Sequence, residues 1–267
     1  MKLVSIIMGI YNCADTIEEA IESIISQTYT EWELIMCDDG SQDETYAVAK
    51  HYQELYPEKI VLIRNPQNMK LAYTLNQCLA QAKGYYIARM DGDDVSVPER
   101  IERQVNYLES HPDIQLVGTG MQRFSDKGYG ACVVSPEKPC PETMKKQVPF
   151  FHATILTYKY VYDSLNGYTV AKYTQRSQDW ELWFRFFDKG YVGENIQDPL
   201  YLVREDENAI KRRSFTSRIQ TIKSTFIGYR MLNFPWWSYI KPVLGIFKGL
   251  VPTKLVMMFR DREARKN

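Results

Sequence analysis

The first hundred residues alternate between short apolar runs and segments of helical periodicity, and this alternation limits the possible folds more than any other feature of the chain. Apolar runs bounded by turn residues predict strands, whereas apolar residues spaced three and four apart predict helices. The expected strands are 3–10, 32–39, 59–65 and 85–91, and the expected helices are 15–27, 41–56 and 69–82. Such alternation forms right-handed crossover units, so we expect an α/β fold with a mainly parallel sheet flanked by helices.

Local signals predict where these helices begin and end. Asp15 is expected to cap the helix 15–27, and the Ser-x-x-Glu pattern of Ser41 and Glu44 predicts a capping box for the helix 41–56. Gly84 is expected to close the third helix.

The following part of the chain is less regular. We expect helices at 98–112 and 178–190, strands at 150–161 and 199–206, a short apolar segment at 114–120 and a Gly/Pro-rich connection at 128–141. We divide the chain into a catalytic part, 1–206, and a C-terminal extension, 207–267.

Charge separates these two parts. The formal net charge is zero, which argues against wholesale nucleic-acid binding, but 14 Lys and Arg face 5 Asp and Glu from Arg204 to the end of the chain. Aromatic and aliphatic residues accompany the positive charges in 211–267. This composition predicts peripheral contact with an anionic membrane, and helices packed back on the catalytic part are the alternative.

Cysteine usage and hydropathy indicate the compartment. The five cysteines are odd in number and lack a Cys-x-x-Cys spacing, which fits reduced thiols in a cytoplasmic protein. The apolar run at the N-terminus is too short for a secretory signal, and no stretch approaches the ~20 apolar residues of a membrane span. We therefore expect a cytoplasmic protein, with peripheral contact at the inner face of the membrane.

Acidic residues follow the expected strands at the edge where parallel sheets bind ligands. The strand ends read "GIYN", "CDDG" and "RMDGDD". An Asp-x-Asp turn suits Mg²⁺ or Mn²⁺, which carboxylates hold together with water and diphosphate oxygens, and Gly92 allows a ligand to approach closely. The alternative is a solvated turn or a helix cap.

Two further carboxylates have similar pairs of interpretations. Asp39 can cap the next helix or accept a hydrogen bond from a nucleobase N–H. Asp179 stands at a helix start, where it can act as an N-cap or as a general base aimed into a cleft.

In order along the chain, three stretches resemble the family 2 inverting glycosyltransferases with the GT-A fold. They read "VSIIMGIYNCADTIEEAIESIISQTYTEWELIMCDDGSQDET", then "NPQNMKLAYTLNQCLAQAKGYYIARMDGDD…PERIERQVNYLES", then "FHATILTYK…NGY…QDWELWFRF…G". The similarity covers roughly residues 3–206.

This resemblance implies a nucleotide-diphospho-sugar donor bound within residues 1–94 and an acceptor side in 95–206. On the donor side, Ile10, Tyr11 and Asn12 would line the base pocket, Asp39 would bind the base, Lys70 would meet a phosphate, Asp91 would meet the ribose beside Gly92, and Asp93 would bind Mn²⁺ or Mg²⁺. On the acceptor side, Asp179 would be the general base, with His152, Gln178 and Trp180 nearby.

The implied reaction is a single inverting displacement, in which Asp179 removes a proton from a hydroxyl of a glycan or lipid-linked acceptor. The donor is expected to be a UDP-sugar, because Asp39 can accept from a pyrimidine N–H. Two positions depart from the family pattern: Gln178 stands where Glu is frequent, and Lys70 where the pattern "NxG" has glycine. A sugar nucleotidyltransferase and a non-catalytic nucleotide-sugar-binding protein are the alternative functions.

Overall fold

The four strands expected in the first part of the chain are present and pair in parallel. They are β1 (Val4–Ile10), β2 (Trp32–Asp38), β3 (Ile60–Arg64) and β4 (Tyr86–Arg89), in the order β3-β2-β1-β4. The register sets Ile10 beside Asp38, and Ile7 beside Arg89. The carboxyl ends of these strands therefore meet at one edge of the sheet in this computed structural model, which describes residues 1–205 and 215–248.

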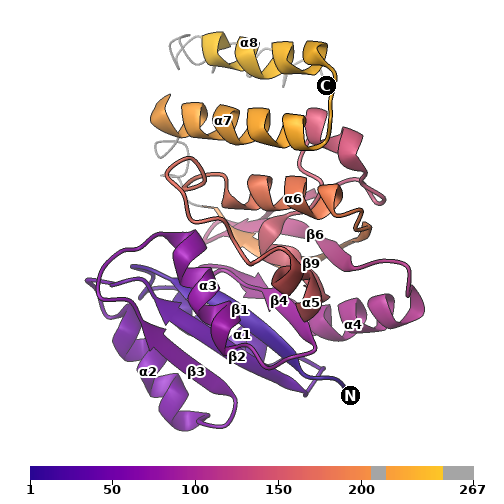
Figure 1. The fold of residues 1–267 in the computed structure, drawn as a ribbon. Helices are drawn as coiled ribbons and strands as arrows, with labels where there is room; N and C mark the ends of the chain where they lie inside the picture. Colours follow the sequence, from indigo (N-terminus) through magenta and orange to yellow (C-terminus); the bar gives the residue numbers. More distant parts are fainter. Residues whose placement is uncertain (206–214, 249–267) are drawn as a thin grey trace.

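The sheet continues with five more strands, several of them antiparallel (Figure 1). These are β5 (Val95–Ser96), β6 (Leu116–Ser125), β7 (Gly128–Val133), β8 (Leu156–Tyr158) and β9 (Gly193–Arg204). β8 pairs antiparallel with both β4 and β6, while β6 and β9 run parallel. The predicted α/β fold is confirmed, with its parallel arrangement concentrated in the first four strands.

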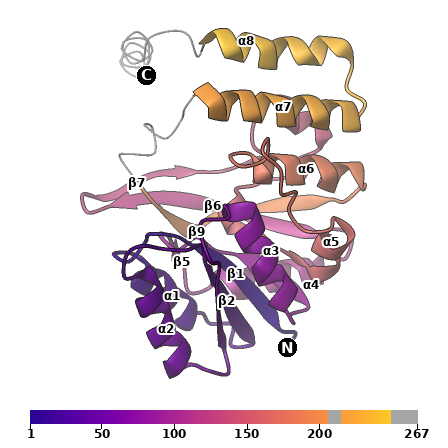
Figure 2. The same ribbon diagram turned by 60° about the vertical axis from the view of Figure 1, so that its left-hand side comes forward.

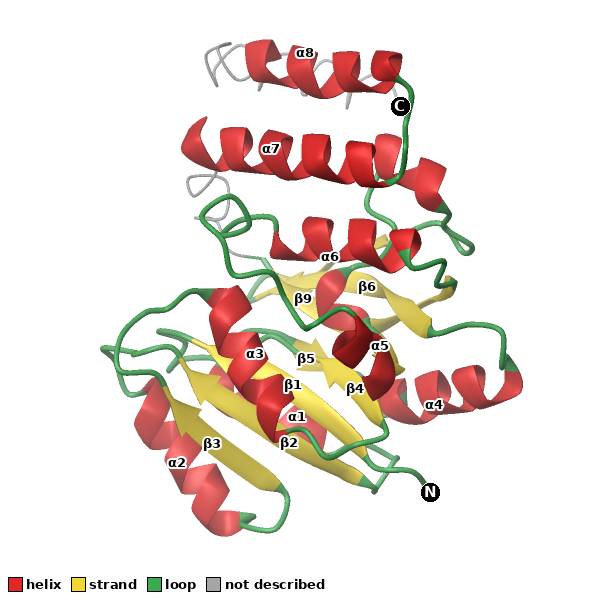
Figure 3. Ribbon diagram, in the orientation of Figure 1, coloured by secondary structure: helices red, strands yellow, loops and turns green. Residues whose placement is uncertain are grey.

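Helices cover both faces of the sheet (Figure 3). They are α1 (Ile17–Ile25), α2 (Thr45–Leu55), α3 (Leu71–Gln81), α4 (Arg100–Ser110), α5 (Lys159–Ser164), α6 (Gln178–Asp188), α7 (Phe215–Met231) and α8 (Ile240–Lys248). Side chains alternate along β1, so Ile6 and Met8 pack with α1, α2 and α4, whereas Ile7 packs with α3, α5 and α6. The sheet is therefore packed between two apolar cores, which fix the position of its ligand-binding edge.

The predicted helix ends are wrong in three places. α1 begins at Ile17 after Thr16, and α2 begins at Thr45 after Glu44, with no side-chain cap on either helix. The Ser41 hydroxyl is unavailable for a capping box because it accepts the backbone N–H of Asn12. Gly84 does not close α3, which ends at Gln81; a Cβ at Gly84 would stand 2.5 Å from the backbone nitrogen of Ser5.

The predicted strand 150–161 is also wrong over most of its length. Only Leu156–Tyr158 pairs as a strand, between the 3-10 helix η2 (His152–Thr154) and α5. The apolar run arises because the segment lies in the core, and burial alone does not distinguish strand from helix.

Two strands differ in extent from the expected segments. The first six residues of the expected connection 128–141 form β7, which pairs with β6, and a further 3-10 helix, η1 (Pro141–Lys145), follows. β9 begins six residues before the predicted strand 199–206, whose last residue lies outside the described residues.

The C-terminal helices are stacked on α6, on the side away from β1–β3 (Figures 1 and 2). α7 is bonded to α6 through the hydroxyls of Ser177 and Ser224, 2.7 Å apart, and the close approach requires Gly228, where a Cβ would stand 2.1 Å from the Phe184 ring. η4 (Trp236–Tyr239) leads into α8. The residues 211–214 and 249–267 of the predicted basic segment lie outside the described part.

All five cysteines are free thiols. Within residues 1–205 and 215–248, no helix combines the length and apolar content that crossing a bilayer requires.

Candidate active site

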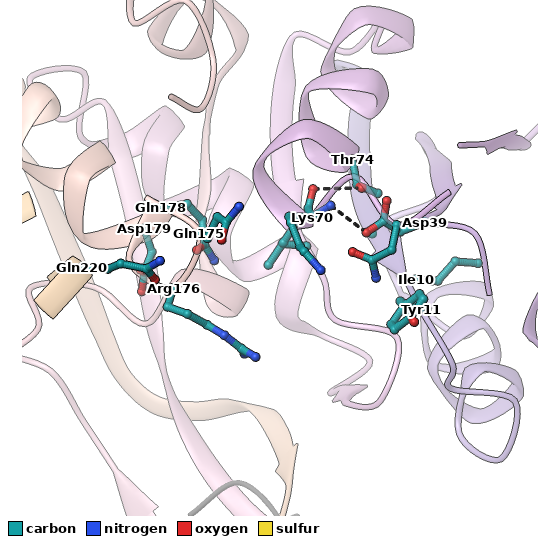
Figure 4. A pocket seen from close by; sticks show the side chains of 13 residues that line it. Ile10, Tyr11, Asp39, Lys70, Thr74, Gln175, Arg176, Gln178, Asp179 and Gln220 are labelled. Atoms are coloured by element: carbon teal, nitrogen blue, oxygen red, sulfur yellow. Dashed lines mark hydrogen bonds between the residues drawn. The ribbon is translucent and has the colours of Figure 1, made fainter. Parts of the chain in front are cut away.

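Two adjoining pockets lie at the carboxyl edge of β1, β2 and β4. The larger has a volume of about 670 Å³. One wall comes from the ends of β1 and β2 and the start of α3, and the other from the start of α6 and from α7 (Figure 4). Its lining includes Ile10, Tyr11, Asp39, Asn68, Lys70 and Thr74 on the first wall, and Gln175, Arg176, Gln178, Asp179 and Gln220 on the second.

The smaller pocket, of about 380 Å³, lies beside the acidic cluster. It is lined by Asn12, Asp91, Gly92, Asp93 and Arg204, among others, and shares Gly9 and Tyr11 with the larger pocket. The structure therefore brings ten of the twelve predicted site residues to these two adjoining pockets. They are Ile10, Tyr11, Asn12, Asp39, Lys70, Asp91, Gly92, Asp93 and, on the second wall of the larger pocket, Gln178 and Asp179.

Asp39 anchors the loop before α3. Its carboxylate is almost fully buried and accepts three hydrogen bonds, from Asn65 Nδ2 (2.8 Å) and from the backbone N–H groups of Met69 (2.7 Å) and Lys70 (3.0 Å). A carboxylate can accept about four such bonds, so one acceptor position of Asp39 is left for a ligand.

Lys70 has a backbone conformation that side chains rarely adopt. Its φ of 75° and ψ of 154° belong to a region populated essentially by glycine. Among the described residues, the other non-glycine residues with positive φ are asparagines, at positions 12, 166 and 233, which tolerate it better. The bonds from Asp39 hold the strained peptide in place, and the ammonium projects into the larger pocket (Figure 4).

The three aspartates after β4 have different surroundings. Asp91 is one-third exposed and forms an ion pair with Arg89, with Oδ1 and Nη2 2.5 Å apart. Asp94 is buried and accepts the backbone N–H of Arg204 at 2.8 Å. Burial, together with the charges of Asp91 and Asp93, raises the pKa of Asp94 to about 8.

Gly92 is tightly packed at this turn. A Cβ there would stand 3.0 Å from Ile10 Cγ2 and 3.2 Å from the Cys13 sulfur. The glycine thus lets the acidic turn lie directly on the end of β1.

The oxygen donors in the smaller pocket fit a divalent cation. Asp93 is exposed and, with Asp91, lines the pocket, and carboxylate oxygens are the donors that Mg²⁺ and Mn²⁺ prefer. Among the residues that the structure describes, no three His, Cys, Asp or Glu side chains are grouped closely enough to hold a metal by themselves. Such an ion would take its remaining ligands from substrate phosphates and water.

Asp179 lies in the first turn of α6 and faces the donor wall across the larger pocket (Figure 4). Burial raises the pKa of its carboxyl group, and the nearby backbone N–H groups of α6 and the Arg89 charge oppose this rise. A raised pKa makes the carboxylate a stronger base. Gln178 lines the same pocket, and its side-chain oxygen is buried with no hydrogen-bond partner among the described residues.

Two residues assigned to the acceptor side do not line the pocket. His152 Nε2 is 2.7 Å from the Tyr168 hydroxyl, and burial and the Arg89 charge lower its pKa well below the usual range, so the ring is neutral. The Trp180 indole N–H donates to Thr225 Oγ1 at 3.0 Å, which joins α6 to α7. Both residues support the wall from behind.

Several lining residues are absent from the sequence-based prediction. Arg176 and Gln175 precede α6, and Gln220 comes from α7, which the sequence assigned to a separate extension. Arg89 gave a signal that went unused: a charged residue inside the apolar run "YYIARM".

Comparison with solved structures defines the class. TarS from S. aureus, solved with UDP-GlcNAc, aligns with a TM-score of 0.69 at 15% identity, over 92% of this chain and 72% of that chain. The mannosyltransferase PcManGT from Pyrobaculum calidifontis, solved with GDP-Man and Mn²⁺, gives 0.64 at 16% identity, over 98% and 80%. The chain has the GT-A fold of these glycosyltransferases.

The family follows from sequence comparison. Residues 5–161 match the model for glycosyl transferase family 2, and the chain belongs to that family. It is 45% identical to the putative glycosyltransferase EpsE of Bacillus subtilis over 97% of this chain and 93% of that protein. It is 29% identical to the amylovoran biosynthesis glycosyltransferase AmsE of Erwinia amylovora, over 98% and 99%.

A third relative has a more specific name. The UDP-Glc:alpha-D-GlcNAc-diphosphoundecaprenol beta-1,3-glucosyltransferase WfaP of Escherichia coli is 29% identical over 76% of this chain and 78% of that protein. The chain is therefore a glycosyltransferase, and the nucleotidyltransferase and non-catalytic alternatives are set aside.

Proposed function

We propose that the protein is a metal-dependent, inverting glycosyltransferase that moves a sugar from a UDP-sugar to a hydroxyl of a glycan or lipid-linked acceptor during synthesis of a bacterial surface polysaccharide. The observation that carries the proposal is the position of Asp179, which faces the donor wall of Asp39 and Lys70 across one pocket (Figure 4). The names of AmsE and WfaP support the polysaccharide setting and the lipid-linked acceptor.

The donor side is built from the ends of β1, β2 and β4. Ile10, Tyr11 and Asn12 flank the base, and the free acceptor position of Asp39 receives the base N–H. Lys70 directs its ammonium at a phosphate, and Asp91, fixed by Arg89, receives a ribose hydroxyl. The sugar is then left in the space between this wall and α6.

The acceptor side supplies the base. Asp179 accepts the proton of the acceptor hydroxyl as that oxygen attacks the anomeric carbon on the face opposite the diphosphate, and a single displacement inverts the configuration. Gln178 lines the same side of the pocket, next to the base, and contacts the acceptor there. A divalent cation held by Asp93 would neutralise the charge on the departing diphosphate.

A donor screen tests the assignment of the nucleotide. Hydrolysis of UDP-, GDP- and dTDP-sugars is measured as release of the nucleoside diphosphate. We expect the rate to be highest with UDP-sugars. We expect Mn²⁺ to support the reaction and EDTA to abolish it, because the carboxylates alone leave the diphosphate charge uncompensated. A clear preference for GDP-sugars would contradict the role given to Asp39, and full activity in EDTA would contradict the metal.

We further propose that the face formed by η4 and α8 contacts the anionic inner surface of the cytoplasmic membrane. Trp236 and Trp237 are 74% and 60% exposed, and Ile240 and Leu244 beside them are 49% and 55% exposed. Tryptophan and aliphatic side chains next to lysines, such as Lys241, suit the boundary between headgroups and acyl chains.

Vesicle sedimentation tests this contact. The protein is expected to sediment with vesicles that contain anionic lipid at low salt, and the double variant Trp236→Ala, Trp237→Ala should weaken this binding by about tenfold. Tyr129→Ala, which removes a 72% exposed aromatic ring from β7, serves as the control and should not change it. If the unmodified protein stays in the supernatant, the membrane proposal fails.

A further inference from the structure

Arg89 is a buried arginine whose charge is only partly matched. It is the last residue of β4 and 1% exposed. Its Nη2 pairs with Asp91 at 2.5 Å, whereas Nε and Nη1 have no hydrogen-bond partner among the described residues. Burying a guanidinium with unmet donors is unfavourable, and an apolar residue would suit this strand position better for stability alone.

The Arg89 charge reaches both sides of the site. Arg89 is bonded to Asp91 on the donor side, and its charge also acts on Asp179 on the acceptor side and on His152 behind the wall. The charged and titratable groups around Asp179 are Arg89, Asp91, Tyr168 and, across or beside the pocket, Lys70 and Arg176. His152 is neutral, so Arg89 is the buried cation that pairs with Asp91 and whose charge acts on Asp179.

Arg100 provides a contrast within the same structure. It is equally buried, but its Nη1 donates to two backbone carbonyls, of Arg89 at 3.0 Å and of Ala153 at 3.2 Å. Arg100 thus ties β4 to η2 and makes no ion pair with a carboxylate among the described residues. Its hydrogen bonds are structural, whereas Arg89 pairs with Asp91 and its charge acts on Asp179, two residues of the proposed reaction.

We propose that Arg89 is a positioning residue that fixes Asp91 for the donor and keeps Asp179 ionised for proton removal, so that one guanidinium serves both halves of the site. This inference rests on the proposed function, because it takes Asp91 and Asp179 as the donor and base residues. The inference gives a role to Arg89, which the proposed function uses only as the partner of Asp91.

The test compares two variants. Arg89→Met fills the volume of the arginine side chain without its charge, and Arg89→Lys keeps the charge but not the planar guanidinium with its fixed hydrogen-bond donors. For Arg89→Met we expect a kcat for donor hydrolysis about a hundredfold lower, and an acid limb of the kcat/KM profile moved about one pH unit upward. For Arg89→Lys the acid limb should stay in place, while UDP affinity measured calorimetrically with Mn²⁺ falls about fivefold.

Arg100→Met is the matched control. It should lower the thermal midpoint at least as much as Arg89→Met does and leave the acid limb unchanged. If Arg89→Met does not fold, the UDP affinity of Arg89→Lys tests the proposal instead. An Arg89→Lys variant that binds UDP as tightly as the unmodified protein overturns the proposal. An unshifted acid limb in a folded Arg89→Met variant overturns it as well.

Asp179→Asn separates this inference from the proposed function. If Asp179→Asn retains transfer, the base assignment itself is wrong. If Asp179→Asn is inactive and the Arg89 variants have normal pH profiles and UDP affinity, the base assignment stands and only the role of Arg89 is wrong.

Discussion

Asp179→Asn is expected to lower kcat for sugar transfer by about a thousandfold and to leave UDP affinity unchanged. Asparagine is nearly isosteric with aspartate but cannot take up the hydroxyl proton, and positioned general bases contribute about 10²–10⁴ to the rate. UDP should still bind, because Asp179 lies on the wall opposite Asp39 and Lys70. Transfer rates with the preferred donor measure kcat, and calorimetric titration with UDP measures the affinity.

The pH dependence gives an independent check on this base. Burial raises the pKa of Asp179, so the reactive ionised form is lost as the pH falls through a value above the usual range for aspartate. In the unmodified protein we expect kcat/KM to fall at acid pH. In Asp179→Asn this fall at acid pH should be absent. Asp188→Asn, at the exposed end of the same helix, is the control and should retain the activity and profile of the unmodified protein. Transfer at the normal rate by Asp179→Asn would refute the mechanism.

Lys70→Gly is expected to make the protein more stable while weakening donor binding about tenfold. Glycine adopts φ 75°, ψ 154° without strain, and such strain costs about 1–3 kcal/mol in other residues. The greater freedom of glycine in the unfolded chain offsets about 0.4–1 kcal/mol of the gain. The weaker binding follows from loss of the ammonium in the pocket.

Lys70→Ala is the matched variant, because it loses the same ammonium but keeps a Cβ and hence the strain. Urea unfolding should show Lys70→Gly to be more stable than Lys70→Ala by about 1 kcal/mol or more, and both variants should bind UDP equally weakly. A Lys70→Gly variant less stable than Lys70→Ala by about 0.4–1 kcal/mol, the full entropic cost of glycine, would show that the Lys70 backbone is unstrained. UDP affinity unchanged in both would remove Lys70 from the donor site.

Sequence periodicity was sufficient for the strands that form the proposed donor side. The strands ending at Ile10, Asp38 and Arg89 were expected within two residues of their observed ends, because each is an apolar run closed by polar turn residues. Their parallel pairing brings Asp39 and Asp91 to one edge without further information. Asp179 could be found because it opens a strongly amphipathic helix.

The features that the sequence did not predict depend on distant contacts. Ser41 resembles a helix cap, but its hydroxyl is bonded to Asn12, 29 positions earlier in the chain. Asp39 resembles a residue with a free carboxylate, but three donors from the loop 65–70 occupy it. Gln220 enters the pocket only because α7 packs on α6, and the periodicity of either helix alone does not specify that pairing.

The bonding of α7 to α6 also has a consequence for how long an acceptor must be. Asp179 lies in the first turn of α6 and lines the same pocket as Gln220 of α7, whereas the tryptophans of η4 follow the far end of α7 at Met231. Because α7 packs on α6, a surface that holds those tryptophans stays at a fixed distance from Asp179, the proposed base. An acceptor anchored in that surface would have to reach along about 16 Å of α7, the rise from Gln220 to Met231, before its hydroxyl meets Asp179.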